Sequence, residues 1–143
     1  MEPLHYLLMK AHTNLNRHIL AQAAGIGLSP GQPKVLECLR QLGQSNQRTI
    51  ASFCEIEPAT VGSILSRMER DGLICRVQQQ DDRRAISVSL TPRGQALSQQ
   101  LEDIFARSDE AAAQLLTPEE QQTLCSLLRR VCAALDDGKE GRV

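Results

Sequence analysis

Residues 81–94 read Asp81-Asp82-Arg83-Arg84-Ala85-Ile86-Ser87-Val88-Ser89-Leu90-Thr91-Pro92-Arg93-Gly94. Four consecutive charged residues are followed by a segment in which apolar and serine side chains alternate. Such alternation is typical of a β-strand with one buried face, here the face of Ile86, Val88 and Leu90. Together with the apolar segment 73–78, it predicts a hairpin of strands 73–78 and 85–90, joined by a polar loop at 79–84.

Helices are predicted for nearly all of the remaining chain. Apolar residues recur at three- and four-residue steps in segments 3–24, 29–42, 47–54, 58–71 and 92–116, and again in 118–135. Ser29-Pro30, Asn46, Thr91-Pro92 and the pair Thr117 and Glu120 are expected to begin helices. The apolar side chains expected to face a core include Leu36, Leu42, Ile50, Phe53, Val61, Ile64, Leu65, Met68, Leu101, Ile104, Leu115, Leu124, Leu127, Leu128, Val131 and Leu135. The predicted fold class is therefore mainly α with a small β-hairpin.

Length and charge narrow the classes of partner. A chain of 143 residues fits one domain, or a small domain with an added assembly element. Aromatic residues make up only 2%, which argues against binding single strands by base stacking. Net charge is −1, but residues 29–94 carry nine basic and seven acidic groups (+2), whereas 95–143 carry five basic and nine acidic groups (−4). A mildly basic middle is compatible with a face that meets phosphate.

The cysteines and histidines predict neither a metal site nor a cofactor. None of the five cysteines forms a C-x-x-C pair, and no signal peptide or membrane-length apolar run is visible. We therefore expect reduced thiols in a cytoplasmic protein with no membrane association, with Cys54 and Cys75 filling the core. No Ser/His/Asp set, carboxylate pair or Gly-rich phosphate loop indicates an enzyme.

Segments 47–54 and 58–71 have the lengths of a helix-turn-helix. The second segment carries small polar residues and one long cation on the face opposite its apolar stripe, among them Thr60, Ser63 and Arg67. Low bulk lets a helix approach base edges in a major groove. The alternative is the solvent-facing stripe of an ordinary helix.

A hairpin directly after such a helix pair is predicted to be a wing. Arg83 and Arg84 at its tip suit the negative potential of a minor groove, and Asp82 is close enough in sequence to pair with a neighbouring arginine. The alternative is a charged, solvated turn. The preceding helix-turn-helix favours the wing.

These segments resemble the MarR family of bacterial transcriptional regulators. Asp82-x-Arg84 with Val88-x-Leu90-Thr91-x-x-Gly94 resembles the family's wing and following helix. Residues 67–74, which read Arg-Met-Glu-Arg-Asp-Gly-Leu-Ile, resemble the exit of its recognition helix, and Leu28-Ser29-x-x-Gln32 resembles its second helix. The resemblance covers essentially the whole chain in order.

The resemblance implies a homodimer that binds a pseudo-palindromic operator in double-stranded DNA, usually as a repressor. The apolar outer helices independently favour a dimer built from both termini. We expect 29–91 to form the DNA-binding domain, and 1–28 with 92–143 to form a helical dimerisation region. The resemblance also implies phosphate contacts from Arg48. Two departures are Gly62-Ser63, which removes a cation from the reading helix, and Glu55, which stands where a turn glycine is frequent.

A small molecule or an oxidant is the kind of signal that the resemblance implies. Polar candidates near the expected effector pocket are His12, Arg17 and His18, with a surface or interface role as the alternative. Cys125 and Cys132 share a helical face and are the redox candidates, with buried structural thiols as the alternative. A winged-helix module that binds protein and not DNA is the competing functional hypothesis.

Overall fold

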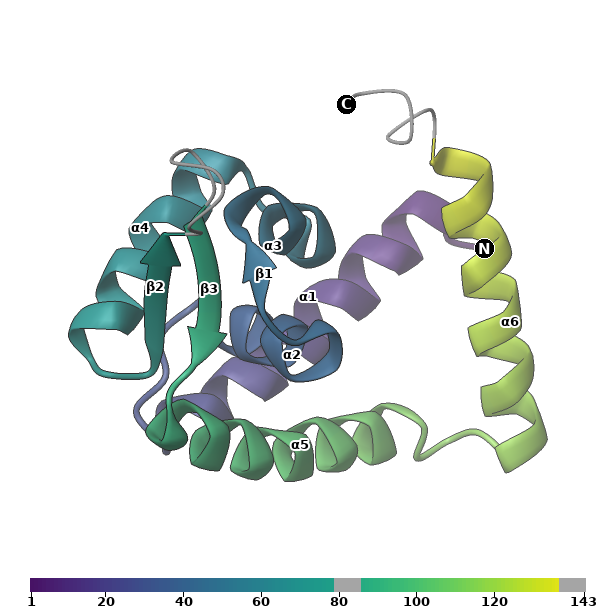
Figure 1. Ribbon diagram of the computed structural model, residues 1–143. Helices are drawn as coiled ribbons and strands as arrows, with labels where there is room; N and C mark the ends of the chain where they lie inside the picture. Colours follow the sequence, from purple (N-terminus) through teal and green to yellow (C-terminus); the bar gives the residue numbers. More distant parts are fainter. Residues whose placement is uncertain (79–85, 137–143) are drawn as a thin grey trace. The chain divides into compact units, whose positions relative to one another are not determined.

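The structure is a computed structural model that describes residues 1–78 and 86–136. Within these residues it contains the helices α1 Leu4–Ala24, α2 Gln32–Leu42, α3 Gln47–Cys54, α4 Pro58–Arg70, α5 Pro92–Ala112 and α6 Pro118–Leu135. The strands are β1 Ser45–Asn46, β2 Ile74–Gln78 and β3 Ile86–Leu90 (Figure 1). The predicted fold class is confirmed. By internal contacts the chain divides into two units, Met1–Ser108 and Asp109–Val143, which are described separately.

The core of Met1–Ser108 is built from aliphatic side chains of nearly every element in the unit. Leu36 of α2, Ile50 of α3, and Leu65 and Met68 of α4 are completely buried. The other buried hydrophobic residues are Ala23, Leu28, Val35, Cys38, Leu39, Ala51, Cys54, Val61, Leu73, Ile74, Val88, Leu101 and Ile104. Tight packing of branched aliphatic residues between helices holds the helix-turn-helix in one geometry.

The hairpin belongs to a three-stranded antiparallel sheet in the order β1-β3-β2. β2 pairs with β3 along its whole length, from Ile74 opposite Leu90 to Gln78 opposite Ile86. β1 pairs with β3 at only two positions and carries no apolar alternation, so periodicity could not reveal it. Ile86 was expected on the buried side, but it is 47% exposed because it stands at the far end of β3, beyond the core.

α2 begins later than Ser29-Pro30 predicts. Its N-cap is Gly31, whose φ of 88° is the left-handed conformation that glycine tolerates. The side chain of Gln32 accepts a hydrogen bond from the Ser29 backbone N–H at 3.0 Å, so the helix residue caps the preceding loop. Pro33 falls in the first turn, where a missing donor costs least.

Three predicted helix starts are confirmed by their hydrogen bonds. Asn46 Oδ1 accepts from the Thr49 N–H at 2.8 Å. Thr117 and Glu120 form a reciprocal capping box at the start of α6. At the start of α5, Thr91 Oγ1 accepts from the Gly94 N–H at 3.0 Å.

The end of α5 and several predicted core positions differ from expectation. α5 ends at Ala112, four residues before the predicted end, and Leu115 beyond it is 96% exposed. Leu42, in the last turn of α2, and Phe53, in α3, are also exposed, so their expected burial was wrong. Both are apolar residues at the edge of a stripe, where periodicity does not distinguish the core from its rim.

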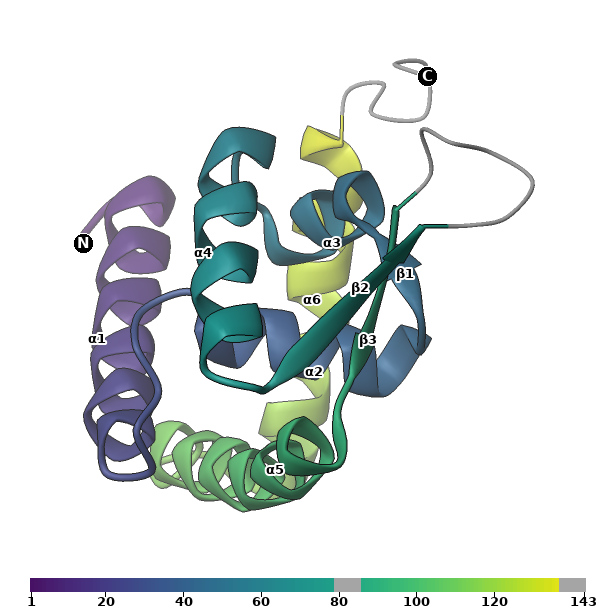
Figure 2. The same cartoon turned by 60° about the vertical axis from the view of Figure 1, so that its left-hand side comes forward.

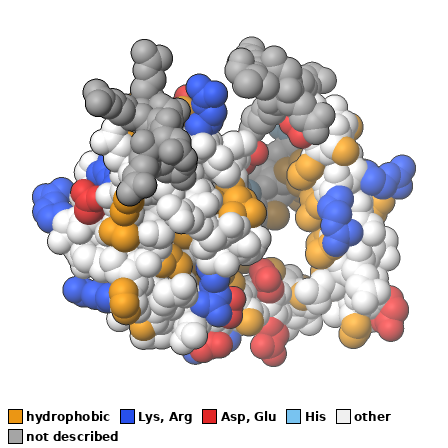
Figure 3. Space-filling model, viewed as in Figure 1, with side chains coloured by type: hydrophobic (Ala, Val, Ile, Leu, Met, Phe, Trp, Pro, Cys, Tyr) orange, Lys and Arg blue, Asp and Glu red, His pale blue; other side chains and the backbone are white. Residues whose placement is uncertain are grey.

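α6, in the unit Asp109–Val143, carries an exposed apolar face. None of its residues is buried in the single chain, and Leu124, Leu127, Leu128 and Leu135 are all exposed. Figure 3 shows the hydrophobic side chains gathered along this helix. The predicted apolar stripe of α6 is therefore present, but its side chains are not buried within a single chain.

Across the described part of the chain, no helix combines the length and the apolar character needed to cross a membrane.

Candidate nucleic-acid interface

The turn between α3 and α4 depends on Glu55. Its φ of 55° is left-handed, and it is the only residue other than glycine with a positive φ among residues 1–78 and 86–136. This conformation ends α3 and lets the Ile56 N–H return to the Ala51 carbonyl at 3.1 Å. The departure noted in the sequence thus leaves the turn geometry intact, with a carboxylate where glycine is easiest.

α4 presents two chemically different faces. Val61, Leu65 and Met68 are fully buried and fix the helix on the core. Ser63, together with Arg67, is exposed on the other side. The helix therefore offers a low, polar surface with one long cation, as a major-groove reader requires.

Gly62 has a packing reason that the sequence did not reveal. Gln47 of α3 donates from Nε2 to the Pro58 carbonyl at 3.0 Å. A Cβ at position 62 would lie 3.1 Å from the same Nε2 atom. The glycine thus leaves room for the Gln47 side chain to reach the start of α4, a contact that the sequence did not predict.

The structure brings together four of the predicted DNA-contacting residues. Arg48 in α3, and Thr60, Ser63 and Arg67 in α4, are all exposed on the helix-turn-helix. Ser63 Oγ makes a long 3.5 Å hydrogen bond to the carbonyl of Ala59 in its own helix. The predicted tip residues Asp82, Arg83 and Arg84 lie outside the described residues.

Arg76 of β2 contacts the helix that follows the turn, α4. Its guanidinium donates to Ser66 Oγ at 2.8 Å, and its Nε lies 3.5 Å from Glu69 Oε2. Both partners belong to α4, so a strand of the hairpin is tied to the reading helix by a charged side chain.

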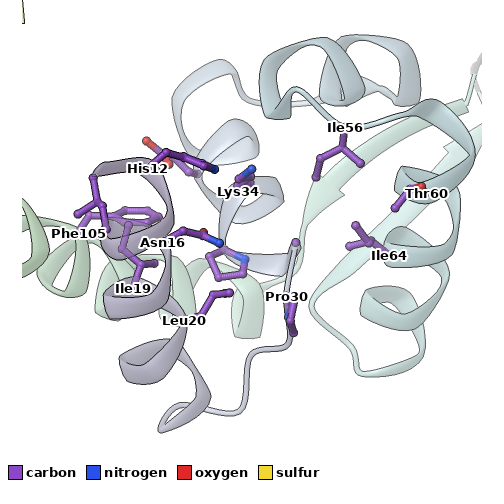
Figure 4. Close-up of a pocket in the computed structure, with 14 residues that line it drawn as sticks. His12, Asn16, Ile19, Leu20, Pro30, Lys34, Ile56, Thr60, Ile64 and Phe105 are labelled. Carbon is purple, nitrogen blue, oxygen red and sulfur yellow. The ribbon is translucent and has the colours of Figure 1, made fainter. Parts of the chain in front are cut away.

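A cavity of about 410 Å³ lies between α1, α2 and α4. His12 of α1, Lys34 of α2 and Thr60 of α4 border it, with Ile64 of α4 on the same side as Thr60 (Figure 4). Most of its wall is apolar. The complete lining is His12, Leu15, Asn16, Ile19, Leu20, Pro30, Gly31, Pro33, Lys34, Glu37, Ile56, Thr60, Ile64 and Phe105.

Of the three predicted effector residues, His12 is the one at this cavity. Arg17 and His18 are exposed on α1 and are not among its lining residues. His18 instead joins α1 to α5, with Nδ1 2.9 Å from Ser108 Oγ and 3.1 Å from Gln22 Nε2. Lys34, in the first turn of α2, borders the cavity and was not predicted.

All five cysteines are free thiols. Cys54 is buried as expected, and burial raises the pKa of its thiol to about 12. Burial also raises the pKa of Cys38, which is hydrogen-bonded to Cys54. Cys75 was expected in the core but is exposed, because it alternates with buried Ile74 along β2.

The redox candidates Cys125 and Cys132 are both exposed on α6. Among the described residues, no group of three or more His, Cys, Asp or Glu side chains is arranged to hold a metal ion.

A second charged contact joins α2 to α5. Arg40 makes a two-point contact with the Glu102 carboxylate, in which Nη2 lies 3.0 Å from Oε2. Its Nη1 also donates to Ser98 Oγ at 3.1 Å. Such forked arginine–carboxylate pairs fix direction as well as distance.

Comparison with known proteins places this geometry among transcriptional regulators. The model of the MarR family matches residues 28–86. An HTH-type transcriptional repressor of Mycobacterium tuberculosis is 26% identical over 132 residues, covering 90% of this chain and 93% of the relative. The homoprotocatechuate degradative operon repressor of Escherichia coli is 36% identical over 80 residues, covering 56% of this chain and 53% of the relative.

Solved structures agree with these sequence matches. BpsR of Bordetella bronchiseptica, whose DNA binding is regulated by 6-hydroxynicotinic acid, superposes with a TM-score of 0.82 at 27% identity, covering 91% of this chain and 98% of that one. A mutant MarR from E. coli complexed with operator DNA superposes with a TM-score of 0.83 at 22% identity, covering 90% of this chain and 93% of that one, which supports the shared fold. Residues 28–86, which hold the helix-turn-helix and most of the hairpin, thus match the MarR family, and the full-length relatives are HTH-type transcriptional regulators.

Proposed function

We propose that this regulator is a homodimeric repressor that binds a pseudo-palindromic operator and is released by a small molecule. The observation that carries the proposal is the exposed, low and polar face of α4 directly before a hairpin. Arg48, Thr60, Ser63 and Arg67 are the proposed contacts of the helix-turn-helix. Arg83 and Arg84 are the proposed minor-groove contacts, with Asp82 supporting the tip. The proposal places the protein in the cytoplasm, where operator DNA lies, and gives it no catalytic role or cofactor.

The proposed dimer uses 1–28 and 92–143, which leaves 29–91 as the DNA-binding domain. Leu4, Leu7 and Met9 of α1 are exposed apolar residues, and α6 independently carries an exposed apolar face. Exposed apolar surface of this kind is typical of an obligate interface. A two-fold dimer also explains why the operator should be a pseudo-palindrome.

The proposed effector site is the cavity bordered by His12 and Lys34. Its volume of about 410 Å³ and its apolar wall suit a compact ring-containing molecule, and the two polar groups suit one acidic or hydroxyl substituent. BpsR is regulated by a molecule of this chemistry. Because Thr60 and Ile64 of α4 border the same cavity, an occupant would touch the reading helix directly. Oxidation of Cys125 or Cys132 is the second candidate signal, favoured by their exposure.

Footprinting on the intergenic DNA upstream of the chain's own gene tests the proposal. We expect a protected palindrome and affinity that falls steeply with salt, because neutralised phosphates release counterions. Changing Arg83 and Arg84 together to Ala should lower the logarithmic salt slope by about two per protomer. Salt-insensitive capture of a protein partner without any footprint would instead support the winged-helix interaction module.

A further inference from the structure

We infer that Arg76 is a positioning residue that locks the hairpin to the reading helix, so that its charge acts inside the protein and not on the DNA. This inference rests on the proposed function, since it concerns how α4 and the hairpin bind the major and the minor groove of one operator at the same time. Arg76 belongs to none of the groups assigned above to phosphate, base or effector.

The strand pattern directs Arg76 toward α4. Residues 74, 76 and 78 share one face of β2, and Ile74 at the start of that face is 2% exposed in the core. Cys75 and Val77, on the opposite face, are exposed. β2 and α4 lie side by side in both ribbon views and pack against each other (Figures 1 and 2). Ile74 makes the apolar part of the contact between β2 and α4, and Arg76, two residues further along the same face, makes the polar part.

The partners of Arg76 are arranged so that one guanidinium can hold β2 to α4 as a brace. Ser66 and Glu69 are three residues apart and thus neighbours on α4. The guanidinium donates to Ser66 Oγ at 2.8 Å and meets the Glu69 carboxylate at 3.5 Å. The side chain of Arg76 is 23% exposed against 45% for Glu69, so the arginine is the more enclosed member of the pair. Arginine can hold two acceptors at fixed directions, whereas lysine presents a single point charge.

The brace matters because the chain between β2 and β3 carries the proposed minor-groove contacts. The last residue of β2 is Gln78, and residues 79–85 follow. The contacts of α4 and of the hairpin strengthen each other only if the protein holds the two elements at the spacing of the two DNA grooves. Fixing β2 on α4 in advance lowers the entropic cost of engaging two grooves at once.

The test compares Arg76→Ala with Arg67→Ala, a proposed DNA contact, and with Arg107→Ala, an exposed residue of α5 that supplies the same change of charge. Operator affinity is measured over a range of salt, and amide hydrogen exchange of segment 74–78 is measured without DNA. For Arg76→Ala we expect about tenfold weaker binding, an unchanged salt slope and faster exchange in 74–78. Arg67→Ala should lower the slope by about one per protomer with the exchange of 74–78 unchanged, and Arg107→Ala should change neither. Arg76→Lys should restore part of the affinity and part of the protection.

Two results would overturn the brace. A lower salt slope with unchanged exchange in Arg76→Ala would make Arg76 a phosphate contact. Faster exchange with unimpaired binding would show that the contact does not position anything. If the wild-type chain binds no duplex, the proposed function fails, and the exchange of 74–78 still decides whether Arg76 holds β2 to α4.

Discussion

At the scale of single residues, the environments of two side chains affect the stability of the fold. Glu55 holds a left-handed backbone in the helix-turn-helix, where a residue with a Cβ is strained. Cys54 keeps a thiol out of water. Each makes a separate prediction about stability.

Replacing Glu55 with Gly should stabilise the fold by about 1 kcal/mol, because glycine adopts the left-handed conformation without steric strain. Urea denaturation measures the change. Glu55→Ala is the matched control, since it removes the same carboxylate and keeps the Cβ. Equal stabilities of the two variants would show that strain at this turn is negligible.

The buried thiol of Cys54 should make stability fall at high pH. Its pKa is raised from 9.0 to about 12 in the fold, so the unfolded chain ionises first as the pH rises. The contribution of this group is complete below pH 9 and is lost between 9 and 12, at a slope of up to about 1.4 kcal/mol per pH unit. Wild type and Cys54→Ala, compared by denaturation from pH 7 to 10, should differ in slope above pH 9. Parallel curves would contradict this account.

At the scale of elements, the junction of hairpin and α5 depends on close backbone contact. Thr91 Oγ1 donates to the Gly72 carbonyl at 2.6 Å, and a Cβ on Gly94 would stand 2.0 Å from the Leu73 carbonyl oxygen. Gly94 thus allows the first turn of α5 to lie against the chain that enters β2.

Gly94→Ala should therefore destabilise the chain by about 2–3 kcal/mol, although alanine is the better helix former. Thermal unfolding measures it. Gly25→Ala should change stability far less, because Gly25 has a φ of −65° and a Cβ there would lie 3.2 Å from the Gln22 carbonyl oxygen. A stabilised Gly94→Ala would mean that the backbone shifts at little cost.

The same elements show how far the sequence alone predicts this fold. The order of the helices, the caps at Asn46 and Thr117 and the paired strands follow from periodicity and local hydrogen bonding, and these are confirmed. The start of α2 and the end of α5 are not where periodicity places them. The strand β1, the role of Gln47 over Gly62 and the pairing of Arg76 depend on contacts between distant segments, which periodicity does not encode. The exposed faces of α3 and α4 could be predicted because the apolar periodicity of each helix identifies the opposite, buried face. The cavity residue Lys34 could not be, since its neighbours come from other helices.

At the scale of the whole molecule, the exposed leucines of α6 suggest that the single chain is not the functional unit. Leu124, Leu127 and Leu128 are exposed in one chain, on a helix with no buried residue. The removal of such side chains from water is a principal driving force of association.

Changing Leu124 and Leu128 together to Asp should give monomers and weaken operator binding at least about tenfold, because two half-sites can no longer be engaged together. Sedimentation and operator titration measure both effects. Gln122→Asp with Ser126→Asp, on the polar side of the same helix, is the charge-matched control and should remain dimeric. A dimeric Leu124/Leu128 variant would place the interface elsewhere.

The cavity wall has a consequence for anyone who wishes to retune this protein as a biosensor. Its α1 side, with Leu15, Ile19 and Leu20, can be varied to admit new compounds without touching α4. Its α4 side is shared with the helix proposed to read DNA, and Ile64 there lies so close to Gly31 that a Cβ would meet it at 2.5 Å. Under the proposed function, libraries confined to α1 should change which compound is sensed, whereas libraries on α4 should also change which operator is bound.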